Sequence, residues 1–90
     1  MNCEKILTRM RGTKSGWGQA DFKSLYEGFG FILREGSNHV VYKHAKYPHL
    51  RATVARHNSL ATGYAKDAVD LIDQLKALEA EENNEPGGND

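Results

Sequence analysis

The sequence predicts an α+β fold, a two-layer sandwich in which helices cover one face of a three-stranded antiparallel sheet, in the order α-α-β-β-β-α. Two observations support this prediction. Along the chain, the apolar residues change from the three-to-four-residue spacing of helices to the alternation of strands, and then back to helical spacing. The three strand-like segments follow one another with short connections, which favours a meander whose apolar face the helices must cover.

Two helices are expected before the sheet. The first occupies residues 2–11, with Asn2 as its N-cap. A glycine-rich segment, residues 11–18, then separates it from a second helix, for which Asp21 is the expected N-cap and Gly30 the left-handed C-terminal residue. Helical spacing places on the buried faces of these two helices the apolar residues Cys3, Ile6, Leu7, Met10, Phe22, Leu25, Tyr26 and Phe29.

The predicted strands are residues 29–35, 39–44 and 50–56, and a tight turn at residues 36–38 joins the first two. Successive side chains of a strand point to opposite faces of the sheet. Alternation therefore places on the face away from the helices the residues His39, Val41, Lys43, Arg51 and Thr53, and it places on the other face Val40, Tyr42, Ala52 and Val54.

A long helix is expected over residues 64–82, with one apolar stripe formed by Ala65, Ala68, Val69, Ile72 and Leu75. The residues after it are polar and rich in Asn and Gly, a composition that cannot bury apolar area. Ninety residues have room for one core. We therefore expect a single domain over residues 1–81 and a disordered acidic tail over residues 82–90.

The net charge of zero hides an asymmetry. Residues 1–66 carry eleven Lys or Arg and four Asp or Glu, a balance of +7, and residues 67–90 carry a balance of −7. A basic body can attract a polyanion. The single cysteine, Cys3, excludes an internal disulfide and a cysteine-based zinc site. No apolar run is long enough for a membrane span and no secretory segment is evident, so a cytoplasmic protein without a membrane partner is expected.

All four histidines, His39, His44, His49 and His57, lie among basic residues between positions 34 and 57. An imidazole, with an ordinary pKa of about 6.5, can both take and give protons near neutral pH. One histidine on an open basic sheet face would suit metal-independent RNA cleavage, in which it removes the proton of a ribose 2′-OH. The alternative is that the histidines are incidental residues of strand ends and loops. Their spacing matches no zinc pattern, and neither a metal nor a cofactor is expected.

The run FGFILREGSNHVVYKH, followed by RATVARHN and a helix, resembles the HicA-type (YcfA-like) mRNA interferase toxins of bacterial type II toxin–antitoxin systems. The matching elements are Gly30-Phe31, Gly36-Ser37-Asn38-His39 and Arg56-His57, and the resemblance covers roughly residues 21–78. It implies a double-stranded-RNA-binding-like fold and an endoribonuclease that cleaves mRNA. It also implies a HicB-type antitoxin as the neutralising partner. The helix over residues 2–11 is additional to this pattern.

The resemblance assigns the catalytic role to His39, as general base, and makes Gly36, Ser37 and Asn38 the turn-forming residues. The basic residues expected to bind RNA phosphates are Lys43 and Arg51, which alternation places on the same face as His39, together with Arg34, Lys46 and Arg56. Two alternatives remain open from the residues themselves. In the first, the domain binds RNA without cleaving it. In the second, it docks a partner protein through its open sheet face or the edge of its third strand.

Overall fold

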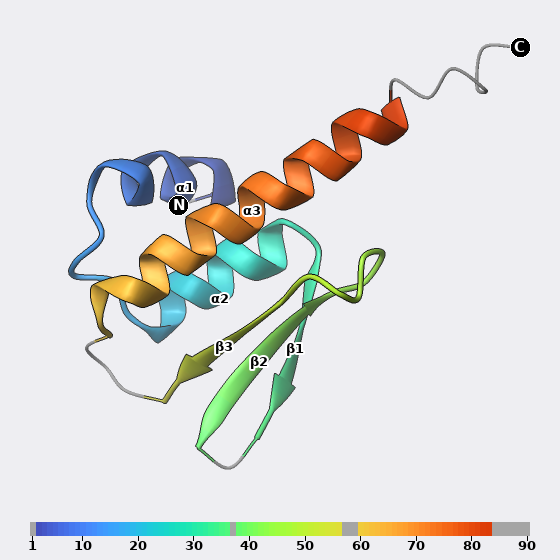
Figure 1. The fold of residues 1–90 in the computed structure, drawn as a ribbon. Helices are drawn as coiled ribbons and strands as arrows, with labels where there is room; N and C mark the ends of the chain where they lie inside the picture. Colours follow the sequence, from blue (N-terminus) through green and yellow to red (C-terminus); the bar gives the residue numbers. More distant parts are fainter. Residues whose placement is uncertain (1, 37, 57–59, 84–90) are drawn as a thin grey trace, which may run out of the picture.

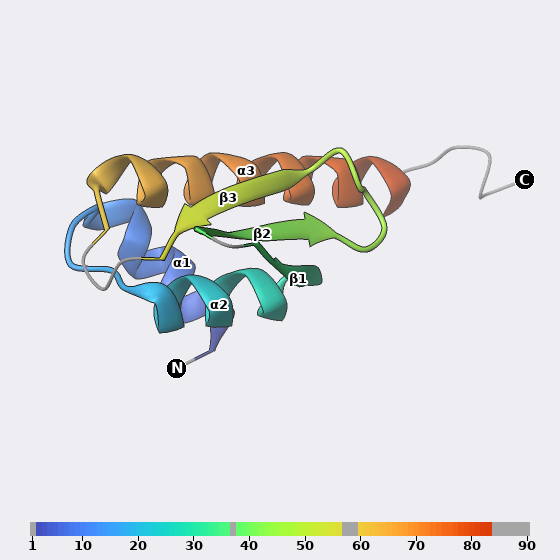
Figure 2. The same ribbon diagram turned by 90° about the horizontal axis from the view of Figure 1, so that it is seen from below.

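The computed structural model describes residues 2–36, 38–56 and 60–83. They form the helices α1 (Cys3–Gly12), α2 (Gln19–Gly28) and α3 (Thr62–Asn83) and the strands β1 (Phe31–Glu35), β2 (His39–His44) and β3 (Arg51–Ala55). The sheet is antiparallel with the order β1-β2-β3. Figures 1 and 2 show the helices on one side of this sheet. The predicted α+β fold, with its order of elements, is confirmed.

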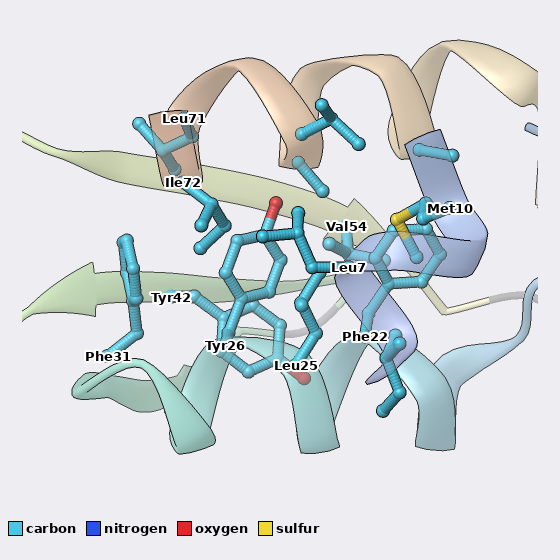
Figure 3. Packing of buried hydrophobic residues seen from close by; sticks show 14 of the residues in the cluster. Leu7, Met10, Phe22, Leu25, Tyr26, Phe31, Tyr42, Val54, Leu71 and Ile72 are labelled. Carbon is cyan, nitrogen blue, oxygen red and sulfur yellow. The ribbon is translucent and has the colours of Figure 1, made fainter. Parts of the chain in front are cut away.

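The core lies between the sheet and the helices (Figure 3). Its central contact is made by Tyr26 of α2 and Tyr42 of β2, whose stacked rings lie 4.6 Å apart. Phe31 packs edge-on against Tyr26 at 5.1 Å. Val40 and Tyr42 are buried, whereas His39 and Lys43 are exposed, so the alternation predicted for β2 is confirmed. Buried aromatic rings contribute much of the stability of so small a core.

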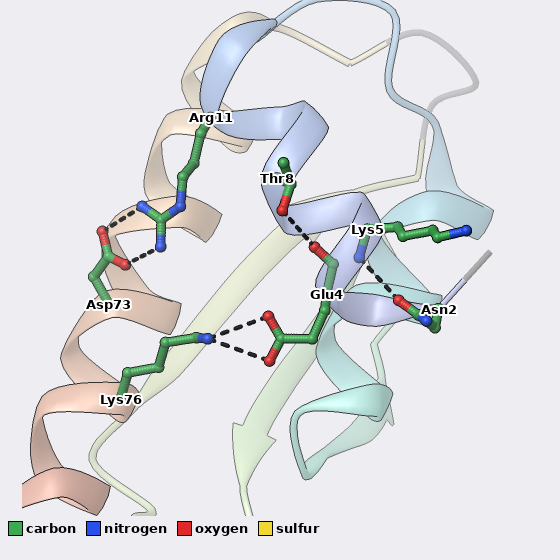
Figure 4. Close-up of polar contacts among 7 residues, drawn as sticks. All are labelled: Asn2, Glu4, Lys5, Thr8, Arg11, Asp73 and Lys76. Carbon is green, nitrogen blue, oxygen red and sulfur yellow. Dashed lines mark hydrogen bonds and ion pairs between the residues drawn. The ribbon is translucent and has the colours of Figure 1, made fainter.

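Helix α1 is an integral part of this domain. Ile6, Leu7 and Met10 are buried in the core, and the side chain of Asn2 caps the helix by accepting a hydrogen bond from the Lys5 backbone N–H at 2.9 Å. Two ion pairs join α1 to α3, one between Arg11 and Asp73 and the other between Glu4 and Lys76 (Figure 4). The helix begins and ends one residue later than the expected range of residues 2–11.

The expected boundary of α2 is wrong at its start. The helix begins at Gln19, and Asp21 lies inside the first turn, where its carboxylate accepts a hydrogen bond from the Gly18 backbone N–H at 2.9 Å. The first backbone N–H groups of a helix have no partner within the helix. The Asp21 side chain, which is the N3 half of a capping box, provides an acceptor for one such donor at the N-cap residue, Gly18. The left-handed conformation predicted for Gly30 is confirmed, with φ of +94°.

Helix α3 is longer than expected at both ends, and Glu82, expected at the start of the tail, is helical. Its carboxylate accepts hydrogen bonds from Lys46 and Tyr47 in the β2–β3 loop, which ties the last turn of α3 to the sheet. The remainder of the expected tail, residues 84–90, lies outside the described residues. Within the described ranges, no helix combines the length and the apolar composition needed to cross a bilayer.

Candidate nucleic-acid interface

The face of the sheet that the helices leave open is basic. Register places the buried Ala55 on this face, directly opposite His39. Register and alternation also place on it seven further residues, all exposed except the partly buried Val41: Ile32, Arg34, His39, Val41, Lys43, Arg51 and Thr53. None of these strand residues is acidic, so the face carries three cations and an imidazole without an opposing carboxylate. We call these seven residues the open face. The sequence predicted five of them.

His39 is the first residue of β2 and follows directly from the β1–β2 turn. The Gly36 backbone N–H donates a hydrogen bond to the His39 carbonyl at 2.9 Å, which closes the turn. A Cβ atom on Gly36 would lie 3.1 Å from the same carbonyl oxygen, so a glycine suits this close approach. Ser37 lies outside the described residues. Within the described part of the chain, the imidazole of His39 has no hydrogen-bond partner, and it is exposed to solvent.

Lys43 and Arg51 lie directly opposite each other on neighbouring strands. In an antiparallel ladder, hydrogen-bonded and non-hydrogen-bonded residue pairs alternate. The His44 N–H donates to the Leu50 carbonyl, so the neighbouring pair, Lys43 and Arg51, is not hydrogen-bonded to each other. The Cα atoms of such a pair are about 4.5 Å apart. Like charges at this position destabilise a sheet. Neither residue forms an ion pair with any described carboxylate. Such a pair is relieved by an anion bound between the two side chains.

Arg34 is the cation of the open face that lies nearest to His39. It pairs with Val41, so it is a diagonal neighbour of His39 across β1 and β2. Diagonal neighbours lie about 7–8 Å apart, within reach of a long side chain. Lys43 is four residues from His39 along β2, which corresponds to about 13 Å at the rise of an antiparallel strand. The cations therefore follow the strand away from the imidazole.

The structure gives different surroundings to the other two basic residues that the sequence assigned to phosphate binding. Arg56 donates hydrogen bonds to the Gly36 carbonyl at 3.0 Å and to the Glu35 carboxylate at 2.9 Å, and it thereby holds the β1–β2 turn. Lys46 lies beyond the opposite end of β2 and pairs with Glu82. The hydrogen bond to Glu82 raises the pKa of Lys46. Only Arg34, Lys43 and Arg51 share the open face with His39.

The other histidines differ from His39. His44 is buried, with 7% of its surface exposed, and its Nδ1 accepts hydrogen bonds from the Lys46 and Tyr47 backbone N–H groups at 3.0 and 3.1 Å. Since Nδ1 is an acceptor, the proton resides on Nε2, which donates to the Phe29 carbonyl at 3.0 Å. His44 is therefore a structural residue, and it lies on the same side of β2 as the buried Val40 and Tyr42. His49 is an exposed loop residue, and His57 lies outside the described residues.

Ile32 is a residue of the open face that the sequence analysis missed. It is 54% exposed, the one large apolar side chain in the described ranges with that degree of exposure. The signal was present, because alternation in β1 places Ile32 on the same face as Arg34. Ile32 pairs with Lys43 and lies two residues from Arg34, so it adds an apolar side chain between two cations of the open face.

A second surface feature is a groove of about 480 Å³ between β3 and α3. Its lining includes Thr53 of β3, Asp67 of α3 and Tyr26 of α2. The Tyr26 side chain is 1% exposed and rises from α2 toward α3 (Figure 3). Its hydroxyl has no hydrogen-bond partner among the described residues. Burial, and then the charge of Asp67, raise the pKa of Tyr26, so the hydroxyl stays protonated and available as a donor.

In residues 2–36, 38–56 and 60–83, no three His, Cys, Asp or Glu side chains gather into a group that could hold a metal ion. Comparison of the chain with protein-family models, with curated proteins and with solved structures finds no match. The resemblance to HicA-type toxins therefore stays a prediction, and the functional argument rests on the open face itself.

Proposed function

We propose that this domain is an endoribonuclease that cleaves mRNA without a metal ion, with His39 as its general base. The observation that carries the proposal is the open face, where an exposed imidazole shares one surface with three cations, and none of these four side chains pairs with a described carboxylate. Cations without carboxylate partners bind phosphate, and an unpartnered histidine is free to take a proton. The fold that goes with this proposal is double-stranded-RNA-binding-like, formed by α2, the three strands and α3.

In the proposed reaction, the imidazole of His39 removes the proton from a ribose 2′-OH. The 2′-oxygen then forms a bond to the adjacent phosphorus while the bond from phosphorus to the 5′-oxygen breaks. The leaving 5′-oxygen takes a proton from water, and the products are a 2′,3′-cyclic phosphate and a 5′-hydroxyl. Arg34, the diagonal neighbour of His39, would stabilise the charge that develops on the phosphoryl oxygens. Lys43 and Arg51 would hold the strand further along β2.

The biological setting that we propose is a toxin–antitoxin pair. The resemblance in Gly36-Ser37-Asn38-His39 and Arg56-His57 supports this chain as the toxin, with a HicB-type antitoxin that covers the open face as its partner. A partner that covers this face must present carboxylates to Arg34, Lys43 and Arg51, since burying three unpaired cations is costly. Antitoxin and RNA therefore compete for the same surface.

The deciding experiment is an RNA cleavage assay with purified protein in the presence of EDTA. We expect His39→Ala to lower the cleavage rate by about 10²–10⁴-fold, the usual contribution of a positioned general base. Binding to RNA that carries 2′-deoxyribose should persist in the variant. The matched control is His49→Ala, because His49 is also an exposed histidine but lies in the β2–β3 loop. Equal losses in both variants, or cleavage that needs a metal, would contradict the proposal.

A second candidate function is partner binding without catalysis, and the groove beside β3 favours it. Arg51 and Thr53 occupy non-hydrogen-bonded positions of the β2–β3 pair, so their backbone N–H and C=O groups point away from β2. They lie along the outer edge of β3, which no described strand covers. Gln19 binds the Ala55 carbonyl and so closes one end of this edge. An extended peptide could add there as a fourth strand. Wild-type protein that binds RNA weakly, never cleaves it and binds such a peptide would favour this function.

A further inference from the structure

The hollow beside Ile32 on the open face has the composition of a small ligand site. It has a volume of about 210 Å³, with Ile32, Ala45 and Pro48 as apolar lining, Arg34 and Lys43 as cationic lining, and the buried His44 as a further lining residue. Since a water molecule occupies about 30 Å³ of liquid, the hollow has room for about seven waters. This is less than the roughly 300–1,000 Å³ of pockets for drug-sized ligands. The hollow therefore suits a single flat group with an apolar face and an anion attached.

We propose that this hollow is a base-binding subsite for single-stranded RNA. The proposal rests on the proposed function, since it places the scissile phosphate at His39. A nucleobase has two apolar faces and carries a phosphate on its own nucleotide, which matches an isoleucine between two cations. The Arg34 guanidinium can lie flat against a base, as Arg does in other RNA sites. Lys43 then holds the phosphate of the same nucleotide.

The position of the hollow sets which nucleotide it binds. Ile32 lies directly opposite Lys43, four residues along β2 from His39 and thus about 13 Å away. The base in the hollow therefore belongs to a nucleotide beyond the one that reacts. Because Ile32 lies on the flat sheet surface, a base can reach it only when it is unstacked and turned out of its helix. This requirement predicts single strands and loops as substrates, and poor cleavage of uninterrupted duplexes.

The test compares the cleavage of two substrates, a dinucleotide and a longer single-stranded oligonucleotide. For the wild type, we expect kcat/KM to be at least about tenfold higher for the longer substrate, the usual effect of one added apolar contact in a pocket. Ile32→Ser should remove most of this advantage, so that kcat/KM falls much more for the longer substrate than for the dinucleotide. Ile32→Leu keeps the apolar side chain and should restore the advantage. A series of oligonucleotides, each lacking the base at one position, should identify one position where removal of the base lowers kcat/KM for the wild type but not for Ile32→Ser.

The outcomes separate this inference from the proposed function. If the wild type cleaves both substrates and Ile32→Ser retains the full advantage for the longer one, the subsite is wrong and the ribonuclease proposal stands. If the wild type cleaves neither substrate, the ribonuclease proposal fails. The subsite is then judged from dissociation constants of the intact and base-deleted oligonucleotides. Equal dissociation constants for the wild type and Ile32→Ser would overturn the subsite. Where the wild type does cleave RNA, equal cleavage of a duplex and a single strand would also overturn the subsite.

Discussion

The two ends of β2 each carry a histidine, and the two residues differ in every respect that matters for function. His39 is exposed and has no partner among the described residues, whereas His44 is buried and bonded at both ring nitrogens. They are five residues apart, so strand alternation places them on opposite faces of the sheet. The comparison shows that residue type and neighbouring charge do not distinguish a buried, hydrogen-bonded histidine from an exposed one without a described partner. The parity of its position in the strand does.

Both ends of β2 are also held by a polar contact from a distant residue. At the His39 end, Arg56 binds Glu35 and the Gly36 carbonyl. At the His44 end, Glu82 binds Lys46 and Tyr47, whose backbone N–H groups donate to His44. If the His39 end serves catalysis and the His44 end serves stability, substitutions at the two ends should affect different measurements.

The largest effect on stability is expected from His44→Ala. The substitution leaves the Phe29 carbonyl and two backbone N–H groups without their partner and opens a cavity beside Phe31, which contacts the ring edge-on at 5.0 Å. We expect the free energy of unfolding to fall by about 2–4 kcal/mol. Chemical denaturation measures this change, and RNA cleavage by the folded variant at low temperature should remain close to that of the wild type. A variant of unchanged stability that no longer cleaves RNA would reverse the assignment of the two histidines.

Gly30→Ala should have the next largest effect, because it strains the backbone beside His44. Gly30 has φ of +94°, and a Cβ atom there would lie 3.0 Å from Nε2 of His44. We expect a loss of about 1–3 kcal/mol in the free energy of unfolding. Gly12→Ala is the matched control, since Gly12 lies in α1 with no atom within 4 Å of the added Cβ. That variant should be at least as stable as the wild type. Equal effects of the two substitutions would contradict the reasoning.

The fold was predictable from the sequence because local signals and packing agree. Helical spacing in α1 and α2 and alternation in β2 identified the buried residues. The boundaries were less predictable where a tertiary contact decides them. Glu82, which lay beyond the expected domain end at residue 81, contacts the β2–β3 loop from the last turn of α3, and residues 35 or 36 positions apart in sequence give no sign of such a contact. The start of α2 was misplaced because Asp21 satisfies the helix end from inside the first turn.

The sequence predicted the site residues whose position follows from strand alternation. It did not predict the contacts of residues outside the strands, whose long side chains reach distant partners. Parity placed His39, Lys43 and Arg51 on one face. Parity has no bearing on Arg56, which follows β3, and its long side chain turns back to the Gly36 carbonyl. Lys46 is a loop residue whose partner lies near the end of α3. A basic residue in a loop can equally face RNA or bind a carboxylate, and the sequence does not distinguish these two situations.

Arg56→Ala should have a moderate effect, and it tests whether the turn positions His39. The contact with Glu35 is partly exposed, so we expect a stability loss of about 1 kcal/mol, including the hydrogen bond to Gly36. Cleavage should fall several-fold because His39 follows the turn directly. Arg56→Lys separates the two interpretations of this residue, because it keeps a charge for phosphate but loses the planar fork. Full cleavage by Arg56→Lys would favour direct phosphate binding. Arg9→Ala, on the exposed side of α1, serves as the control for lost charge.

The smallest effect is expected from Glu82→Gln, at the opposite end of β2. The hydrogen bond from Lys46, and then that from Tyr47, hold the pKa of Glu82 below its ordinary value of 4.5. A lowered pKa in the folded state means that the contact stabilises the protein above pH 4.5, and that this contribution is lost as the pH falls through the lowered pKa. Glu82→Gln should therefore lower the urea midpoint slightly at pH 7, and the difference from the wild type should vanish at acidic pH.

Glu81→Gln is the matched control for this last prediction, since Glu81 is the exposed neighbour on α3 and forms no ion pair with a described residue. It should leave the urea midpoint unchanged at both pH values. RNA cleavage should also be the same in both variants, because the Glu82 contact holds the end of β2 that carries His44. A decrease in cleavage caused by Glu82→Gln alone would mean that the β2–β3 loop contributes to the RNA surface. Lys46 would then return to the set of phosphate-binding residues, and the functional division between the two ends of β2 would be lost.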